Sequence, residues 1–253
     1  MRLAEETTTT AGAALDDVEV AVLPVGSVEQ HGPALPLGTD FMAAEAMAGT
    51  VADRNDVVVL PTLPVGVSEH HRQFHGTLWT RPEILEAYVL DTVESMATHG
   101  VRKAVVVNGH GGNTDALTRA ARRLRTDGTA FALPWSWWNS VTDLFDDLFD
   151  SEGGHAGASE SSIMMAIAEE LVREEELAAA GEGAPEGWGE TVHGAEVGFD
   201  TVDFTPTGAV GDPTEASCEA GEHLVEAASE ELDALVDWLA DQPFEELLPE
   251  PHR

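Results

Sequence analysis

A carboxylate and an imidazole lie two residues apart at Glu29 and His31, and a second carboxylate, Asp40, follows them. In an extended backbone, side chains two residues apart point the same way, so this pair can face one ion. Carboxylate oxygens and imidazole nitrogens are ligands of divalent metals such as zinc and manganese. One carboxylate, such as that of Asp40, can bridge two metals about 3.5–4 Å apart. The alternatives are a Glu-x-His pair on the surface and an aspartate that only caps a helix.

Three more residues of these chemical kinds lie in or beside glycine-rich segments. His110 stands between glycines, where the missing side chains let the backbone approach a bound ion closely. His155 follows two glycines, and Glu160 comes shortly after it. The alternative for His110 is a loop histidine that is satisfied by hydrogen bonds. The alternative for His155 is a cap on the helix that follows.

Alternating strand and helix patterns predict the elements that position these residues. Short apolar runs, most of them rich in valine, predict strands at 18–25, 56–60, 103–107 and 129–133. Helical patterns cover 40–51, 81–99, 114–125, 159–171 and 214–239. This order predicts an α/β fold with parallel βαβ units and a covered sheet. Ligands bind at the carboxyl ends of such strands, so the six candidate residues are expected to meet in one place.

The surface is expected to be strongly acidic. The chain has 47 Asp and Glu against 12 Lys and Arg, a net charge of −35, and Lys103 is its only lysine. Such a surface would repel a nucleic-acid backbone and an anionic membrane, so neither is an expected partner. Acid-rich, lysine-poor composition indicates a halophilic protein, because at 1 M salt the Debye length is about 3 Å and like charges hardly repel. The alternative is an ordinary acidic enzyme.

The composition also permits a buried core. Hydrophobic residues make up 43% of the chain and fall in periodic blocks without a clear linker, so we expect one domain over residues 1–253. The single cysteine, Cys218, excludes an intramolecular disulfide and a cysteine-based zinc cluster. No signal-like segment opens the chain, and no apolar stretch approaches the length of about 18 residues that a membrane helix needs. We therefore expect a cytoplasmic protein.

Five sequence segments carry a family resemblance: LPVGSVEQHGP at 23–33, LPLGTD at 35–40, NGHGGN at 108–113, GHAGASESS at 154–162 and TGAVGDP at 207–213. Together they resemble the signature of the creatininase (creatinine amidohydrolase) family. The resemblance implies a three-layer α/β/α subunit with a mostly parallel sheet. It also implies a hydrolase of carbon–nitrogen bonds other than peptide bonds, with two divalent metals per subunit (Zn, Fe or Mn), commonly assembled as a homo-hexamer.

The resemblance also implies a ligand set. Glu29, Asp40 and His110 would bind one metal, and His31 would bind the second, with Asp40 as the bridge. In creatininase itself, a glutamate two residues after the histidine of the second motif completes the shell of the second metal. This chain has Gly112 at that position.

We expect Glu160 to supply the carboxylate that Gly112 lacks; the alternative is a second metal site that is weaker or empty. His155 matches a histidine thought to handle protons at the substrate in the family. Water between two cations loses a proton readily and would attack the amide carbon. His155 is then the candidate that protonates the leaving nitrogen, and it forms the expected catalytic pair with Glu160.

Two further segments are expected to contact substrate. SEHHRQFHGT at 68–77 resembles a substrate-side loop of family members that do not act on creatinine. In it, His70 would contact substrate or metal, and Arg72 would meet a phosphate or carboxylate. Trp137 and Trp138 match the aromatic wall of the creatinine pocket. The alternatives are a solvated loop, and tryptophans that belong to the core or to a subunit interface.

Gly112 and the histidine-rich loop argue against creatinine as the substrate. The resemblance then points to a formylaminopyrimidine ribotide deformylase of flavin and deazaflavin biosynthesis, because salt adaptation favours an archaeal source. The alternatives are creatinine hydrolysis and trimming of a mycofactocin precursor peptide. An alternative of another class is a metal-free assembly or binding protein, for which Gly112 is the only support.

Overall fold

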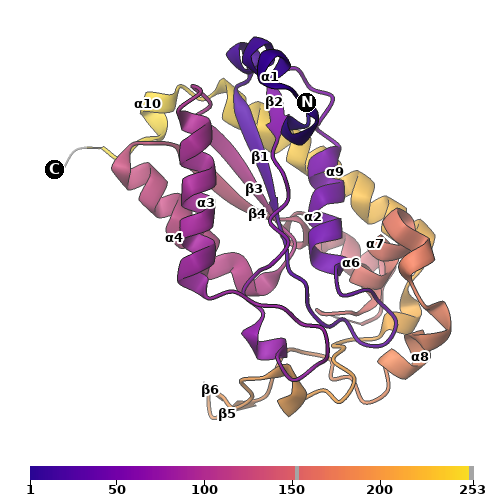
Figure 1. Cartoon of the computed structure of the whole chain (residues 1–253). Helices are drawn as coiled ribbons and strands as arrows, with labels where there is room; N and C mark the ends of the chain where they lie inside the picture. The colour runs from indigo at the N-terminus through magenta and orange to yellow at the C-terminus, as the bar shows by residue number, and fades with distance from the viewer. Residues whose placement is uncertain (152–153, 251–253) are drawn as a thin grey trace.

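Four parallel strands form the central sheet in the computed structural model, which describes residues 1–151 and 154–250 (Figure 1). The strands are β1 (Val20–Val25), β2 (Val57–Val59), β3 (Lys103–Asn108) and β4 (Phe131–Ser136), in the order β2-β1-β3-β4. In the register of the sheet, Val22 pairs with Val59 on one side and with Val105 on the other.

Helices surround the sheet, and a short hairpin lies apart from it, at the bottom of the view in Figure 1. The helices are α1 (Thr8–Ala14), α2 (Thr39–Gly49), α3 (Pro82–Ala97), α4 (Thr114–Asp127), α5 (Trp137–Ser140), α6 (Thr142–Leu148), α7 (Ala158–Ala168), α8 (Leu177–Ala180), α9 (Cys218–Asp241) and α10 (Phe244–Leu247). The hairpin pairs β5 (Thr191–Val192) with β6 (Ala195–Glu196) in antiparallel fashion.

Period-two alternation along the strands separates two apolar cores. Val20 and Val22 face α2, α7 and α9, whereas Ala21 and Leu23 face α3 and α4. Each face is thus covered by its own helices, as Figure 1 shows. Full burial of one leucine, such as Leu224 on α9, contributes about 1.5–3 kcal/mol. The predicted three-layer α/β/α fold with a parallel sheet is confirmed.

The element bounds differ from the sequence prediction in a few places. β4 extends to Ser136 and includes Trp135, because both residues continue the ladder with β3. The closing helix α9 begins at Cys218, after a short 3-10 turn at 213–215. The β5–β6 hairpin was not predicted, since two-residue strands leave no periodic signal. In the part of the chain that the structure describes, no helix has the length and apolarity of a membrane span.

Candidate metal centre and active site

The first cluster of acidic and imidazole groups joins the ends of β1 and β3. Glu29 follows β1, His110 follows β3, and Asp40 is the second residue of α2. Nδ1 of His110 lies 3.2 Å from Oε2 of Glu29 and 3.3 Å from Oδ2 of Asp40. All three side chains are buried. The predicted first ligand set is thus brought together.

The second cluster shares Asp40 with the first. Nε2 of His31 lies 3.0 Å from Oδ1 of Asp40 and 3.5 Å from Oε2 of Glu160 on α7. The two oxygens of Asp40 therefore face different imidazoles, which is the arrangement that a bridging carboxylate requires. Asp40 does not cap its helix, because Gly38 is the N-cap of α2 and no side chain caps it.

Backbone carbonyls orient the ring nitrogens that turn away from the clusters. Nε2 of His110 lies 3.0 Å from the carbonyl oxygen of Val67, and Nδ1 of His31 lies 3.1 Å from that of Glu29. A carbonyl only accepts, so each of these nitrogens carries the ring hydrogen. The opposite nitrogen faces the carboxylates and is the one that would offer a lone pair once a metal replaces its proton. Histidine ligands of metals are usually held by such a bond.

Several buried polar atoms in the clusters have no hydrogen-bond partner. They include both carboxylate oxygens of Glu29 and Oδ2 of Asp40. Buried charged oxygens without partners are costly, and metal coordination is one of the ways in which proteins satisfy them. The donor set also suits a divalent ion: Glu29, His31 and Asp40 offer ligand atoms within 4.8 Å of one another. These residues therefore fit the metal that the sequence predicts.

The electrostatics of the clusters favour a cation. Although burial opposes ionisation, the facing His110 and His71 imidazoles hold the pKa of the Glu29 carboxyl well below its usual range. Burial lowers the pKa of His31, yet the Asp40 carboxylate outweighs it and raises that pKa to about 10. The carboxylates thus attract positive charge strongly, and a divalent ion would replace protons there.

The pKa values of the two predicted catalytic residues, Glu160 and His155, are shifted in opposite directions. Burial raises the pKa of the Glu160 carboxyl to about 7. Burial, together with the positive charge of nearby His31, lowers the pKa of His155 well below its usual value. Glu160 is anchored because Oε2 accepts a 2.6 Å hydrogen bond from the backbone N–H of Ala156. Perturbed groups of this kind gather at active sites.

His155 does not cap the helix that follows it, because Gly157 is the N-cap of α7 and no side-chain hydrogen bond caps that end. Nε2 of His155 instead lies 2.9 Å from the backbone carbonyl oxygen of Gln30. Its ring packs against that of His31 at a centroid distance of 4.4 Å. His155 therefore lies at the second cluster.

A cavity of about 780 Å³ opens onto both clusters. His70, Trp137 and Trp138 line it, and their contact with substrate stays a prediction. Arg72 is not among the described lining residues: its guanidinium makes 2.6 and 2.5 Å hydrogen bonds to the carboxylate of Asp200. This bidentate pair leaves little of its charge for an anionic substrate.

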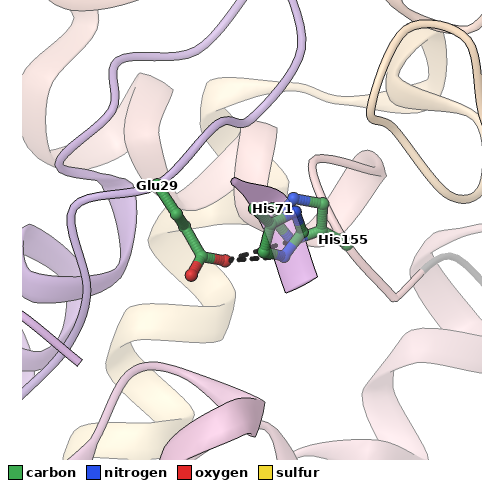
Figure 2. A group of neighbouring side chains, drawn as sticks. All are labelled: Glu29, His71 and His155. Carbon is green, nitrogen blue, oxygen red and sulfur yellow. Dashed lines mark ion pairs between the residues drawn. The ribbon is translucent and has the colours of Figure 1, made fainter. Parts of the chain in front are cut away.

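Two residues of the site were missed in the sequence. His71, next to the predicted His70, is fully buried, and its Nε2 lies 3.2 Å from Oε1 of Glu29. Figure 2 shows it beside Glu29 and His155. Trp188 packs its ring edge-on against His70, His71 and His155 at centroid distances of 5.7–5.8 Å. The His-His pair was a usable signal for His71, whereas the glycine-rich loop around Trp188 gave none.

The local structure explains why position 112 holds a glycine and not a glutamate. A Cβ at this position would overlap the carbonyl oxygen of Val67 and the ring of His110. A glutamate there would therefore displace the loop that orients His110. Glu160 reaches His31 from α7 instead. This is the arrangement expected if Glu160 takes the place of the missing carboxylate.

A covered parallel sheet with a buried Glu/Asp/His centre at its carboxyl edge defines a metal-dependent α/β hydrolase. The sequence model described as "Creatininase: Creatinine amidohydrolase" matches residues 4–236. The chain thus belongs to the creatininase family, which includes hydrolases of carbon–nitrogen bonds.

Individual relatives differ in what they act on. The mycofactocin precursor peptide peptidase of Mycolicibacterium smegmatis is 34% identical and aligns over 89% of this chain and 87% of its own length. The 2-amino-5-formylamino-6-ribosylaminopyrimidin-4(3H)-one 5'-monophosphate deformylase of Methanothermobacter thermautotrophicus is 32% identical over 56% of each chain. The peptidase likeness therefore covers more of the molecule.

Solved structures support the fold and the metal. A crystal structure of creatininase superposes with a TM-score of 0.80 at 27% identity, covering 96% of this chain and 98% of that one. A creatininase of Zn-Zn type and one described as "Creatininase Mn" have TM-scores of 0.78 and 0.76, both at 27% identity and both covering 94% of this chain and 98% of theirs. The enzyme is thus a metal-dependent amidohydrolase of this family.

Proposed function

We propose that this enzyme hydrolyses an amide bond in a phosphate-free substrate, as a relative of the mycofactocin precursor peptide peptidases, with two divalent metals per subunit. The observation that carries the proposal is the sharing of Asp40 between two buried clusters at the floor of one cavity. Zn, Mn and Fe all suit the Glu/Asp/His donors.

Each cluster would hold one ion. Glu29 and His110 with Asp40 form the first set, and His31 and Glu160 with Asp40 form the second. Bound metals would polarise the amide carbonyl and lower the pKa of water, which supplies the nucleophile. The protein holds its ligands in place through bonds to backbone groups, so little reorganisation is needed when the substrate binds.

His155 is placed to transfer the proton that the leaving nitrogen needs. Its Nε2 is held by the carbonyl of Gln30, so Nδ1 carries the lone pair and lies 3.8 Å from Oε1 of Glu29. Because burial lowers the pKa of His155, the ring is neutral at rest, and Nδ1 is the nitrogen that would take up the proton released by the attacking water. It would then deliver this proton to the leaving nitrogen. Glu160, with its pKa raised to about 7, can share this role near neutral pH.

The cavity walls support a substrate without phosphate. Aromatic rings make up much of the lining: Trp137, Trp138, Phe145, Trp188 and Phe199. No lysine or arginine is among the described lining residues, and the whole chain carries a net charge of −35. A monophosphate would have to enter against this field without a cation to receive it. The likeness to the deformylase is the observation that favours the second candidate, ribotide deformylation.

A substrate comparison tests the proposal. The zinc-loaded, manganese-loaded and iron-loaded enzyme is incubated with a mycofactocin precursor-type peptide, with creatinine and with the formylaminopyrimidine ribotide. Released peptide, creatine and formate are then quantified. We expect cleavage of the peptide and little formate. Formate release that exceeds peptide cleavage with every metal would refute the proposed substrate class and establish the deformylase instead.

Matched histidine variants test the metal centre in the same assay. His110→Ala should lose metal and activity together, whereas His223→Ala, an exposed histidine on α9, should lose neither. A His110→Ala enzyme with full activity would contradict the ligand assignment. A wild-type chain that takes up no metal would instead support the metal-free binding protein. The homo-hexamer and the cytoplasmic location stay predictions.

A further inference from the structure

One histidine of the centre is oriented differently from the others. His31, His110 and His155 each direct one ring nitrogen at a backbone carbonyl, which fixes the ring hydrogen on that nitrogen. Nδ1 of His71 faces no carbonyl. It lies 2.9 Å from the amide nitrogen Nε2 of Gln30 and 2.9 Å from the hydroxyl of Thr201.

The side-chain amide of Gln30 can be oriented in only one way. Its Oε1 accepts a 3.0 Å hydrogen bond from the backbone N–H of Gly32, which only donates. Its Nε2 lies 3.0 Å from the carbonyl oxygen of Gly208, which only accepts. A flipped amide would oppose both groups. Nε2 of Gln30 therefore faces His71 as a donor, with one N–H given to Gly208 and one left over.

That remaining N–H has two possible acceptors, Nδ1 of His71 and Nε2 of His155, which lies 2.8 Å from it. His155, however, has its own acceptor, since its Nε2 lies 2.9 Å from the backbone oxygen of Gln30. With the ring hydrogen of His155 on Nε2, only Nδ1 of His71 can accept from the Gln30 amide. His71 then carries its hydrogen on Nε2.

This hydrogen faces the carboxylate of Glu29. Nε2 of His71 lies 3.2 Å from Oε1, an ion-pair contact outside hydrogen-bond geometry, while Oε2 of the same carboxylate faces His110. Both His71 and Glu29 are fully buried, so water does not compete for this contact. The grouping of Glu29, His71 and His155 has the spacing of a metal site, but a metal there would require a bare Nε2 on His71. The tautomer argues against a third ion.

We propose that His71 is a positioning residue whose Nε2–H points at Oε1 of Glu29 through an ion-pair contact and so leaves Oε2 as the metal ligand, with the Gln30 amide fixing the required tautomer. This rests on the proposed metal role of Glu29. It assigns a function to the buried contact between His71 in the loop at 69–71 and Thr201. It also explains Gly208, where a Cβ would collide with the Gln30 amide.

Nitrogen NMR of the full chain tests the tautomer without substrate. With ¹⁵N-labelled histidine, protonated and bare ring nitrogens differ clearly in shift, and the His71→Asn spectrum identifies the signals of His71. We expect a protonated Nε2 and a bare Nδ1 on His71. In Gln30→Glu the donor becomes an acceptor, so the hydrogen should move to Nδ1. A milder variant, Thr201→Val, should leave Nε2 protonated. A bare Nε2 on His71 in the wild-type chain would overturn the proposal.

Two isosteric variants test the positioning. Glutamine at 71 places an amide nitrogen near the position of Nε2, whereas asparagine places one near Nδ1. Zinc affinity, measured by competition with a chromophoric chelator, should fall about 10–100-fold in His71→Asn. In His71→Gln it should stay within a few-fold of the wild type. Equal losses in the two variants, or no loss in His71→Asn, would overturn the positioning role.

Zinc stoichiometry distinguishes a positioning role of His71 from a role as a metal ligand. Positioning leaves the number of ions per subunit unchanged at saturation in His71→Asn, whereas the loss of a whole ion would show that His71 is a ligand and overturn the proposal. If the wild-type chain binds no metal, the proposed function fails. The nitrogen shifts need no metal and would still decide where His71 carries its hydrogen.

Discussion

Asp40→Asn is the substitution that most directly probes the shared carboxylate. Its two oxygens lie 3.0 Å from Nε2 of His31 and 3.3 Å from Nδ1 of His110. Asparagine keeps the shape of the side chain but removes the charge and leaves only one oxygen. If Asp40 bridges two ions, both sites lose a ligand at once. A substitution of His110 should weaken the first site most.

The size of the effect follows from the ligand count. Each proposed site would keep two of its three protein ligands, Glu29 and His110 in one and His31 and Glu160 in the other. Changing a neighbour of a ligand costs about 10–100-fold in affinity, so losing a charged ligand should cost at least about 100-fold, or about 2.8 kcal/mol, per ion. Metal present at about 100 times Kd stabilises the fold by about 2.7 kcal/mol. Losing this should lower Tm by about 5–11 °C per ion.

Chelator competition and thermal melts at fixed free zinc measure these quantities. Asp91→Asn, an exposed aspartate on α3, is the matched control and should behave as the wild type. We expect Asp40→Asn to weaken both zinc-binding steps and His110→Ala mainly one. A loss of one step only in Asp40→Asn would refute the bridge. Unchanged zinc binding would refute Asp40 as a ligand.

Further predictions concern the surface and the packing. Raising KCl from 0.1 to 1 M shortens the Debye length from about 10 to about 3 Å, so the Tm of this acidic chain should rise; a fall would contradict halophilic adaptation. Arg54 pairs with Asp56, Asp233 and Asp237, and hydrogen bonding to Arg54 lowers the pKa of Asp56. Arg54→Ala should therefore cost about 1 kcal/mol in urea unfolding at pH 7. The pKa of Asp56 is lower in the folded chain than in the unfolded chain. The loss of unfolding free energy in Arg54→Ala should therefore be present above the ordinary aspartate pKa of about 3.9 and shrink as the pH falls below it. A loss that does not change with pH would exclude the Asp56 contact as its source. A Cβ at Gly221 on α9 would overlap the carbonyl of Ser162 on α7, so Gly221→Ala should cost about 1–3 kcal/mol. An unchanged unfolding midpoint would refute that close approach.

The fold was largely predictable because its signals are local. Valine-rich runs, helix caps and glycines follow from short-range periodicity, and alternating elements leave few arrangements besides a covered parallel sheet. The carboxyl ends of parallel strands meet at one edge, so Glu29, Asp40 and His110 could be expected to converge from their places after strands. Their residue types indicated metal binding, because carboxylate and imidazole donors suit a divalent metal and can be recognised before the distances between them are known.

Tertiary structure decided what depends on contacts between distant segments. The choice between His70 and His71 rests on which ring turns inward, and the Gln30 amide and Thr201 hydroxyl settle this from segments far along the chain. Arg72 lost its predicted role as a free cation because Asp200, on a loop without periodic signal, pairs with it. Sequence alone thus determined the donors and the sheet edge that gathers them. Single hydrogen bonds decide which nitrogen of each imidazole carries the ring hydrogen, and only the folded chain forms those bonds.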